Sequence, residues 1–228
     1  MFSLAPLLLL LACDNNSELA QPATPPAPLE VSSATPAQVK LTGSLQVISI
    51  KNGTAPVAGT LQVLDGELAL RDRDAWSGAS GKVQIALTSF DSVNPLRDQR
   101  VRDILLQVPL HPTASFELTG VSGLPADGIA VGATGDGELS GQISLAGATQ
   151  AVQVPVTIHR TGVEAWDVAT AEPIGLSLRG FGLQNQVEAL RVECAHESID
   201  DVVKVGFQVT ASAAQPAPPP PEEPPPAE

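Results

Sequence analysis

The sequence contains no tyrosine, and aromatic residues of all kinds make up only 3% of its 228 residues. Stacking platforms for nucleic-acid bases or sugars are therefore not expected. Basic residues are also scarce, since 12 lysines and arginines stand against 25 aspartates and glutamates, which gives a formal charge of -13. This balance argues against nucleic acid as a partner and against electrostatic docking to anionic lipid headgroups.

Residues that carry chemistry are few and scattered. The three histidines, His111, His159 and His196, show none of the H-E-x-x-H, C-x-x-C or EF-hand spacings that build local metal sites. There is no G-x-S-x-G nucleophile elbow and no phosphate-binding loop. Cys194 has no basic neighbour in sequence closer than Arg191, so its thiol is expected to be inert. We therefore expect no catalytic residues, no metal and no resident cofactor.

One apolar run, which begins near Leu4, ends in Leu10-Leu11-Ala12-Cys13. It has about half of the ~20 residues that a membrane-spanning helix needs. A small residue directly before a cysteine at the end of such a run resembles the lipobox of bacterial lipoproteins, in which the cysteine is acylated and becomes the mature N-terminus. Residues 1–12 are then a signal peptide, Cys13 is a membrane anchor, and the protein faces the periplasm from the cell envelope. Since no lysine or arginine precedes the run, a buried apolar strand or helix is the alternative.

Composition divides the rest of the chain into three parts. Residues 13–37 are rich in proline, alanine and serine and are expected to form an extended tether. Residues 38–212 have the mixture of apolar and polar residues of one globular domain, and 43% of the whole chain is hydrophobic, which is ample for a core. Residues 213–228 form a tail of proline and glutamate of the polyproline II type.

Within residues 38–212 apolar and polar residues alternate with a period of two, as in half-buried strands. Val39, Leu41, Leu45 and Val47 begin the pattern, and Asn52-Gly53 after them is a hairpin signal. Further alternating runs fall at residues 57–63, 68–70, 83–87, 116–118, 139–145, 152–158, 174–178 and 203–209. This many one-sided strands without a disulfide favour a closed, all-β antiparallel barrel, which leaves no exposed edge.

One helix is expected, from Leu96 to about Val108, because Val101, Ile104 and Leu105 recur at helical spacing and Pro109 follows. It would cap one mouth of the barrel. Its charges are close enough in sequence to pair, Asp98 with Arg102 and Arg100 with Asp103. Two interpretations remain open for them. Either surface pairs orient the helix, or Arg97 or Arg100 turns toward the mouth and meets a polar lipid head.

Three motifs in order resemble the YceI-like family of periplasmic lipid-binding proteins. They are SVNPLRDQRVRDIL at residues 92–105 running into HPTASFEL at 111–118, GELSGQISLAGATQAV at 137–152, and RGFG at 179–182. The resemblance implies an eight-stranded up-and-down barrel of lipocalin type, with an elongated apolar interior that holds a polyisoprenoid chain or quinone in some members, and it implies no catalysis. The family's usual histidine and phenylalanine of the first hairpin are missing, where this chain has Ser49-Ile50-Lys51-Asn52 and Gly59-Thr60-Leu61.

We therefore expect a protein that binds or transports a long apolar molecule, an isoprenoid, quinone or fatty-acyl lipid, in the bacterial envelope. The alternative is the same barrel with a filled core, acting through its outer surface or its proline-rich tail. Trp76 and Trp166 either line the interior or pack at strand ends. The residues expected to point into the cavity are Leu41, Leu45, Val57, Leu61, Val83, Ile85, Ile104, Phe116, Leu118, Ile143, Val154, Val156 and Leu176.

Overall fold

A computed structural model describes residues 37–71 and 76–213. The predicted signal peptide, Cys13, the tether up to residue 36 and the tail from residue 214 lie outside the described residues. Within the two described ranges, no helix has the length and apolarity that a membrane crossing requires.

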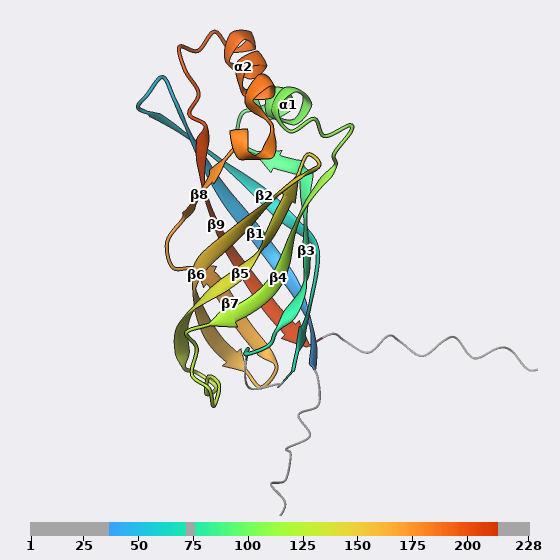
Figure 1. Cartoon of the computed structure of the whole chain (residues 1–228), viewed down its shortest axis with the longest axis vertical. Helices are drawn as coiled ribbons and strands as arrows, with labels where there is room; N and C mark the ends of the chain where they lie inside the picture. The colour runs from blue at the N-terminus through green and yellow to red at the C-terminus, as the bar shows by residue number, and fades with distance from the viewer. Residues whose placement is uncertain (1–36, 72–75, 214–228) are drawn as a thin grey trace, which may run out of the picture. The chain divides into compact units, whose positions relative to one another are not determined.

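The sheet is closed. Each strand is antiparallel to its neighbours in the order β1-β2-β3-β4-β5-β6-β7-β9, and β9 also pairs with β1 (Figure 1). The short strand β8 pairs with Val202–Val205 of β9, beyond the stretch 208–212 that pairs with β7. The strands are β1 (Ala37–Lys51), β2 (Ala55–Leu70), β3 (Ser80–Asp91), β4 (Thr113–Ser122), β5 (Thr134–Leu145), β6 (Ala148–Gly162), β7 (Ala165–Thr170), β8 (Ile174–Ser177) and β9 (Val202–Ala213). The prediction of an eight-stranded antiparallel barrel is confirmed, with β8 as an additional strand.

The alternating pattern sets which face of each strand is inside. On β6, Val154, Val156 and Ile158 are 4%, 0% and 0% exposed, whereas the residues between them lie on the outer face. The hairpin between β1 and β2 turns at Asn52 and Gly53, whose φ angles of 52° and 75° are the left-handed values that these residue types tolerate. The turn residues and the burial pattern therefore specify the same strand register. A shift of the register by one residue would move the apolar side chains of a strand to the outer face.

The helical segment expected over residues 96–108 is shorter and less regular than predicted. It consists of α1 (Pro95–Arg100), followed by a π-helical turn, η1 (Val101–Leu105). Asn94 caps α1, since its side-chain oxygen accepts from the backbone N–H of Arg97 at 3.0 Å, and Pro95 occupies the first position. The helix cannot continue to Val108, because Gln107 has a φ of 49° and Pro109 disfavours a helical residue before it.

The expectation of a single internal helix is wrong. A 3-10 turn, η2 (Arg179–Phe181), leads into a second helix, α2 (Gln184–Glu193), and α2 packs beside α1 and η1 at one end of the barrel (Figure 1). The loop after α2 is fastened to the tip of the β1–β2 hairpin. Asn52 N donates to Ser198 O at 2.9 Å, and Asp200 N donates to Ile50 O at 2.9 Å. We call this end, with α1, η1, α2 and the hairpin tip, the helical end.

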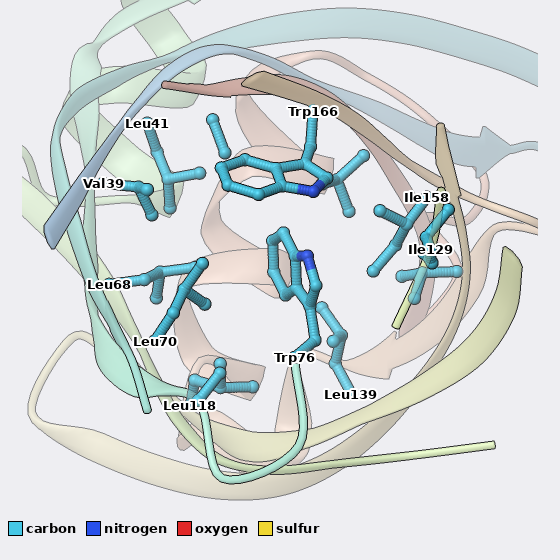
Figure 2. Close-up of a cluster of buried hydrophobic side chains, with 14 of the residues drawn as sticks. Val39, Leu41, Leu68, Leu70, Trp76, Leu118, Ile129, Leu139, Ile158 and Trp166 are labelled. Atoms are coloured by element: carbon cyan, nitrogen blue, oxygen red, sulfur yellow. The ribbon is translucent and has the colours of Figure 1, made fainter. Parts of the chain in front are cut away.

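The opposite end is closed by tryptophan packing. Trp76 and Trp166 meet edge to face with ring centroids 6.1 Å apart, and both are buried among aliphatic side chains (Figure 2). Arg160 lies 5.7 Å from the Trp166 ring centre and is only 6% exposed. Its guanidinium donates to the carbonyl oxygens of Ile129 and Val163, each at 2.8 Å, which satisfies a buried charge with fixed backbone acceptors. We call this the tryptophan end.

The charge pairs predicted within the first helix do not form. Asp98 is buried and accepts from both the backbone N–H and the hydroxyl of Ser92, at 2.8 and 2.6 Å. Arg102 donates to the carbonyl oxygen of Phe90 at 3.0 Å, and Arg100 pairs with Glu193 of α2 at 3.0 Å. These side chains therefore attach the helix to β3 and to α2, because tertiary partners replace the local ones.

Candidate functional site

The barrel encloses a cavity of about 290 Å³. It runs from Trp76, at the tryptophan end, to Leu190 and His196, at the helical end. Every strand of the closed barrel contributes side chains to its wall. The sequence left a filled core and a hollow interior open, and the structure has the hollow interior.

The wall is almost entirely aliphatic and aromatic. Eleven of the thirteen residues expected to point inward line the cavity, namely Leu41, Leu45, Val57, Leu61, Val83, Ile85, Phe116, Leu118, Ile143, Val154 and Leu176. Val156 is fully buried, but it packs in the core cluster around the two tryptophans rather than on the cavity wall. Ile104 does not line the cavity either, whereas its neighbours Val101, Leu105 and Leu106 do.

A glycine makes room for one of the aromatic side chains on the wall. A Cβ atom on Gly59 of β2 would lie 2.5 Å from Cε2 of Phe90, a contact too short for real atoms. The absence of a side chain lets the Phe90 ring lie across β2 on the inner face, and both residues border the cavity. The Phe90 ring covers the backbone of Gly59, which has no side chain of its own to do so, and this part of the wall therefore stays apolar.

The first helical segment and α2 close the helical end. Leu105 and Leu106 from the former and Leu190 from the latter face the cavity. Two polar contacts join them in addition to the packing of α2 against η1: Arg100 pairs with Glu193 at 3.0 Å, and the Gln186 side chain donates to that of Gln107 at 3.4 Å. We call α1, η1 and α2 together the lid. Its inner face is apolar, and the ion pair between Arg100 and Glu193 on its outer side is weak, since partly exposed ion pairs contribute only ~0–1 kcal/mol.

The polar residues of the wall include a basic set at the helical end. Lys51 ends β1, Arg97 lies in α1, and Cys194 and His196 directly follow α2. Arg97, one of the two predicted head-group candidates, lines the cavity, whereas Arg100 does not and instead pairs with Glu193.

Burial lowers the pKa of His196 below its usual value of 6.5, and the positive charges of Lys51, Arg97 and Arg100 lower it further. Basic side chains therefore gather at this end of the cavity in a protein of formal charge -13.

Sequence reasoning missed Lys51 and His196 as wall residues. They are separated by most of the chain and meet only because the loop after α2 binds the hairpin tip, where Lys51 and Ile199 form an isolated bridge. Cys194 has a basic neighbour in space that the sequence did not indicate, since Nη1 of Arg100 lies 3.8 Å from its sulfur. Among the residues that the structure describes, no group of three or more His, Cys, Asp or Glu is placed to hold a metal ion.

Trp76 and Trp166 have different roles. Trp76 lines the bottom of the cavity, whereas Trp166 is completely buried and contributes to packing alone. The indole nitrogens of both are buried without a hydrogen-bond partner within the described part of the chain.

Comparison with known proteins gives a consistent result. The chain is 29% identical over 153 residues to a UPF0312 protein of Azotobacter vinelandii, a match that covers 64% of this chain and 71% of the relative. Among solved structures, a polyisoprenoid binding domain from Saccharophagus degradans, implicated in plant cell wall breakdown, is similar with a TM-score of 0.63 and 18% identity, over 76% of this chain and 98% of that one. Burkholderia cenocepacia BcnA is similar with a TM-score of 0.54 and 16% identity, over 75% and 96%.

The two structural matches are too distant in sequence to show more than a shared fold. The model of the YceI-like domain, however, matches residues 33–211, which is most of the chain and includes strands β1 to β8 and all but the last two residues of β9. The chain therefore belongs to the YceI-like family.

Proposed function

We propose that this protein binds one long apolar molecule inside its barrel and carries it in the bacterial cell envelope, without catalysing a reaction. The observation that carries the proposal is the cavity of about 290 Å³ inside the barrel, whose wall is almost entirely apolar apart from a few polar residues, most of them at the helical end. Burial of an acyl or prenyl chain there contributes about 0.8 kcal/mol per methylene, so even a partly filled cavity retains its ligand.

Three ligand classes suit the cavity: isoprenoids, quinones and fatty-acyl lipids. The membership of the YceI-like family and the similarity to a polyisoprenoid binding domain support the proposal. Candidate contacts are the eleven predicted wall residues named above, from Leu41 to Leu176, together with Leu105 and Leu106 of the lid. Arg97 is the polar-head candidate that faces the same space.

The test is extraction of the purified protein with organic solvent, followed by mass spectrometry. We expect a lipid in amounts close to one per protein, and a rise of Tm when a long quinone or isoprenoid is added to extracted protein, because a ligand that binds only the folded state stabilises it. A protein that yields no lipid and shows no rise of Tm with any of the three classes would contradict the proposal.

The proposed place of the protein in the envelope depends on Cys13. We propose that Cys13 is acylated and that residues 14–36 tether the barrel to the membrane, which brings the cavity close to a source of lipid. In a Cys13→Ser variant the protein should lose lipoprotein-type cleavage and leave the membrane fraction, as followed by fractionation and intact mass. Membrane association equal to that of the wild type would contradict the anchor, while leaving the binding proposal untouched.

A further inference from the structure

The wall of the cavity contains positive side chains but no negative ones. Lys51, Arg97 and His196 line it at the helical end, and none of the wall residues is an aspartate or glutamate. This is unusual for a chain in which acidic residues outnumber basic ones by 25 to 12. Chance placement would favour carboxylates at the opening.

Lys51 and Arg97 also lack counter-ions. Within the described residues neither forms a salt bridge, whereas the neighbouring Arg100 pairs with Glu193 at 3.0 Å. Lys51 and Arg97 are both half-buried, so each loses part of its hydration without gaining a protein anion. An anion at this point would restore the lost stabilisation, since bonds between ionised partners are among the strongest in proteins.

His196 responds to the same positive field. The groups that face it are Lys51 from β1, Arg97 and Arg100 from α1, and Arg191, whose Nη1 donates to the His196 carbonyl oxygen at 2.9 Å. Glu193 of α2 is held by Arg100, and the pKa of His196 is lowered. Burial is the largest cause of this lowering, and the charges of Lys51, Arg97 and Arg100 act in the same direction.

We propose that the cavity selects an amphiphile with an anionic head, a carboxylate or a phosphate ester, and that Lys51, Arg97 and His196 hold this head at the helical end while its chain fills the barrel. The inference rests on the proposed function and makes it more specific. A neutral quinone or alcohol of equal chain length fills the same apolar space but gives the two cations no partner. Selectivity between charged and neutral lipids therefore depends on this end of the cavity alone.

The test compares matched pairs of ligands by titration of the full-length protein after solvent extraction. One pair is palmitic acid and hexadecanol, and the other is farnesyl phosphate and farnesol. We expect the anionic member of at least one pair to bind about tenfold more tightly than its alcohol, because hydrogen bonds to charged groups are stronger than neutral ones. A preference confined to palmitic acid identifies a fatty-acid head, and one confined to farnesyl phosphate identifies a phosphate head.

Substitution locates the head. Lys51→Gln and Arg97→Gln should each weaken binding of the preferred anion about tenfold and leave binding of its alcohol unchanged. Lys204→Gln is the control, since Lys204 is exposed on the outer face of β9 near the same end and carries the same charge. The control should bind both ligands as the wild type does, and all three variants should keep the wild-type Tm without ligand.

A second readout follows the His196 imidazole by NMR. Bound anion should raise the pKa of His196, because a negative charge offsets the cations that lower it, and bound alcohol should not. If alcohols bind as tightly as anions, or if Lys51→Gln and Arg97→Gln do not affect binding of the anion, the inference is wrong and the proposed function still stands. If none of the four ligands binds, the inference is wrong, and solvent extraction together with a long quinone then decides whether the proposed function is wrong as well.

Discussion

The two ends of the barrel are built differently. At the tryptophan end, Trp166, Ile158 and Leu70 are completely buried, and Arg160 joins two loop carbonyls beneath them. At the helical end, the lid covers the cavity with a few apolar side chains. Buried hydrogen bonds between Asp98 and Ser92 hold it to the end of β3, and its other connections include the half-buried pair of Arg100 and Glu193. Four large apolar side chains on or beside the lid, Val93, Leu96, Leu110 and Val192, are 58–94% exposed.

This difference separates stability from binding. A densely packed end is costly to open, since each buried side chain there contributes to the core. A weakly attached end opens at low cost, because loosely held segments are the ones that unfold or move locally. We therefore infer that a ligand enters and leaves at the helical end, and the following predictions are ordered by the size of the expected effect on this comparison.

The largest effect is expected at the tryptophan end. Val156→Asp places a carboxyl group at a completely buried position without a partner, which costs several kcal/mol of a typical domain stability of ~5–15 kcal/mol. We expect little or no soluble folded protein, as judged by expression and circular dichroism. Gln153→Asp, an exposed position on the same strand, is the control and should fold. A folded Val156→Asp variant would show that the inner and outer faces of β6 are exchanged.

Substitution of isoleucine by alanine at two positions compares the packed core with the cavity wall. Ile158→Ala should cost ~2–5 kcal/mol in urea unfolding, because it opens a void among completely buried side chains. Ile85→Ala should cost only ~1–2 kcal/mol without ligand, since Ile85 already borders an empty space. Equal costs at the two positions would mean that the interior around Ile85 is filled.

Two adjacent residues of the lid test its apolar inner face. Leu105→Asp should speed ligand release about tenfold and leave the strand signal in circular dichroism unchanged, because it places a charge on the inner face of the lid alone. Ile104→Asp is the comparison, because helical periodicity predicted that Ile104 faces the cavity, whereas in the structure it does not line it. This variant should release ligand at nearly the wild-type rate. Reversed results would place the lid in a different register over the opening. Release is measured by transfer of a fluorescent lipid to vesicles.

The smallest effect concerns pH. Because the pKa of His196 is lowered in the folded protein, the unfolded chain binds a proton more readily below the ordinary value of 6.5. Without ligand, stability should therefore decline slightly as the pH falls below 6.5, and His196→Gln should remove this part of the decline. The measurement is the urea midpoint at pH 7.5 and 5.5 for both proteins. An identical decline in the variant would show that other groups cause it.

The barrel and most of its wall were predictable, because strand alternation is a local property. Residues such as Val154 on β6 and Leu61 on β2 face inward for the same reason in any closed sheet of this kind. The pattern alone could not distinguish Val156 from Val154, since both are inside and only tertiary packing decides which one borders the cavity.

The helical end was poorly predicted for physical reasons. α2 has a weak apolar face, with Leu190 as its one buried residue, and no side chain caps its first turn at Leu183. Its helical structure therefore depends on packing against η1 rather than on a local signal. Lys51 and His196 could not be assigned to one site either, because contacts between the hairpin and the loop after α2 bring them together from distant parts of the sequence.

The central claim, that a long apolar chain occupies the interior, is tested most directly by NMR on isoleucine methyl groups. With an unlabelled isoprenoid or fatty acid bound, intermolecular NOEs should reach Ile85, Ile143 and Ile174 on the cavity wall. Ile158, which is buried but lies outside the wall, should show none. Ile199 also borders the cavity. NOEs confined to isoleucines outside the wall, or none at all from a ligand that binds, would contradict the claim.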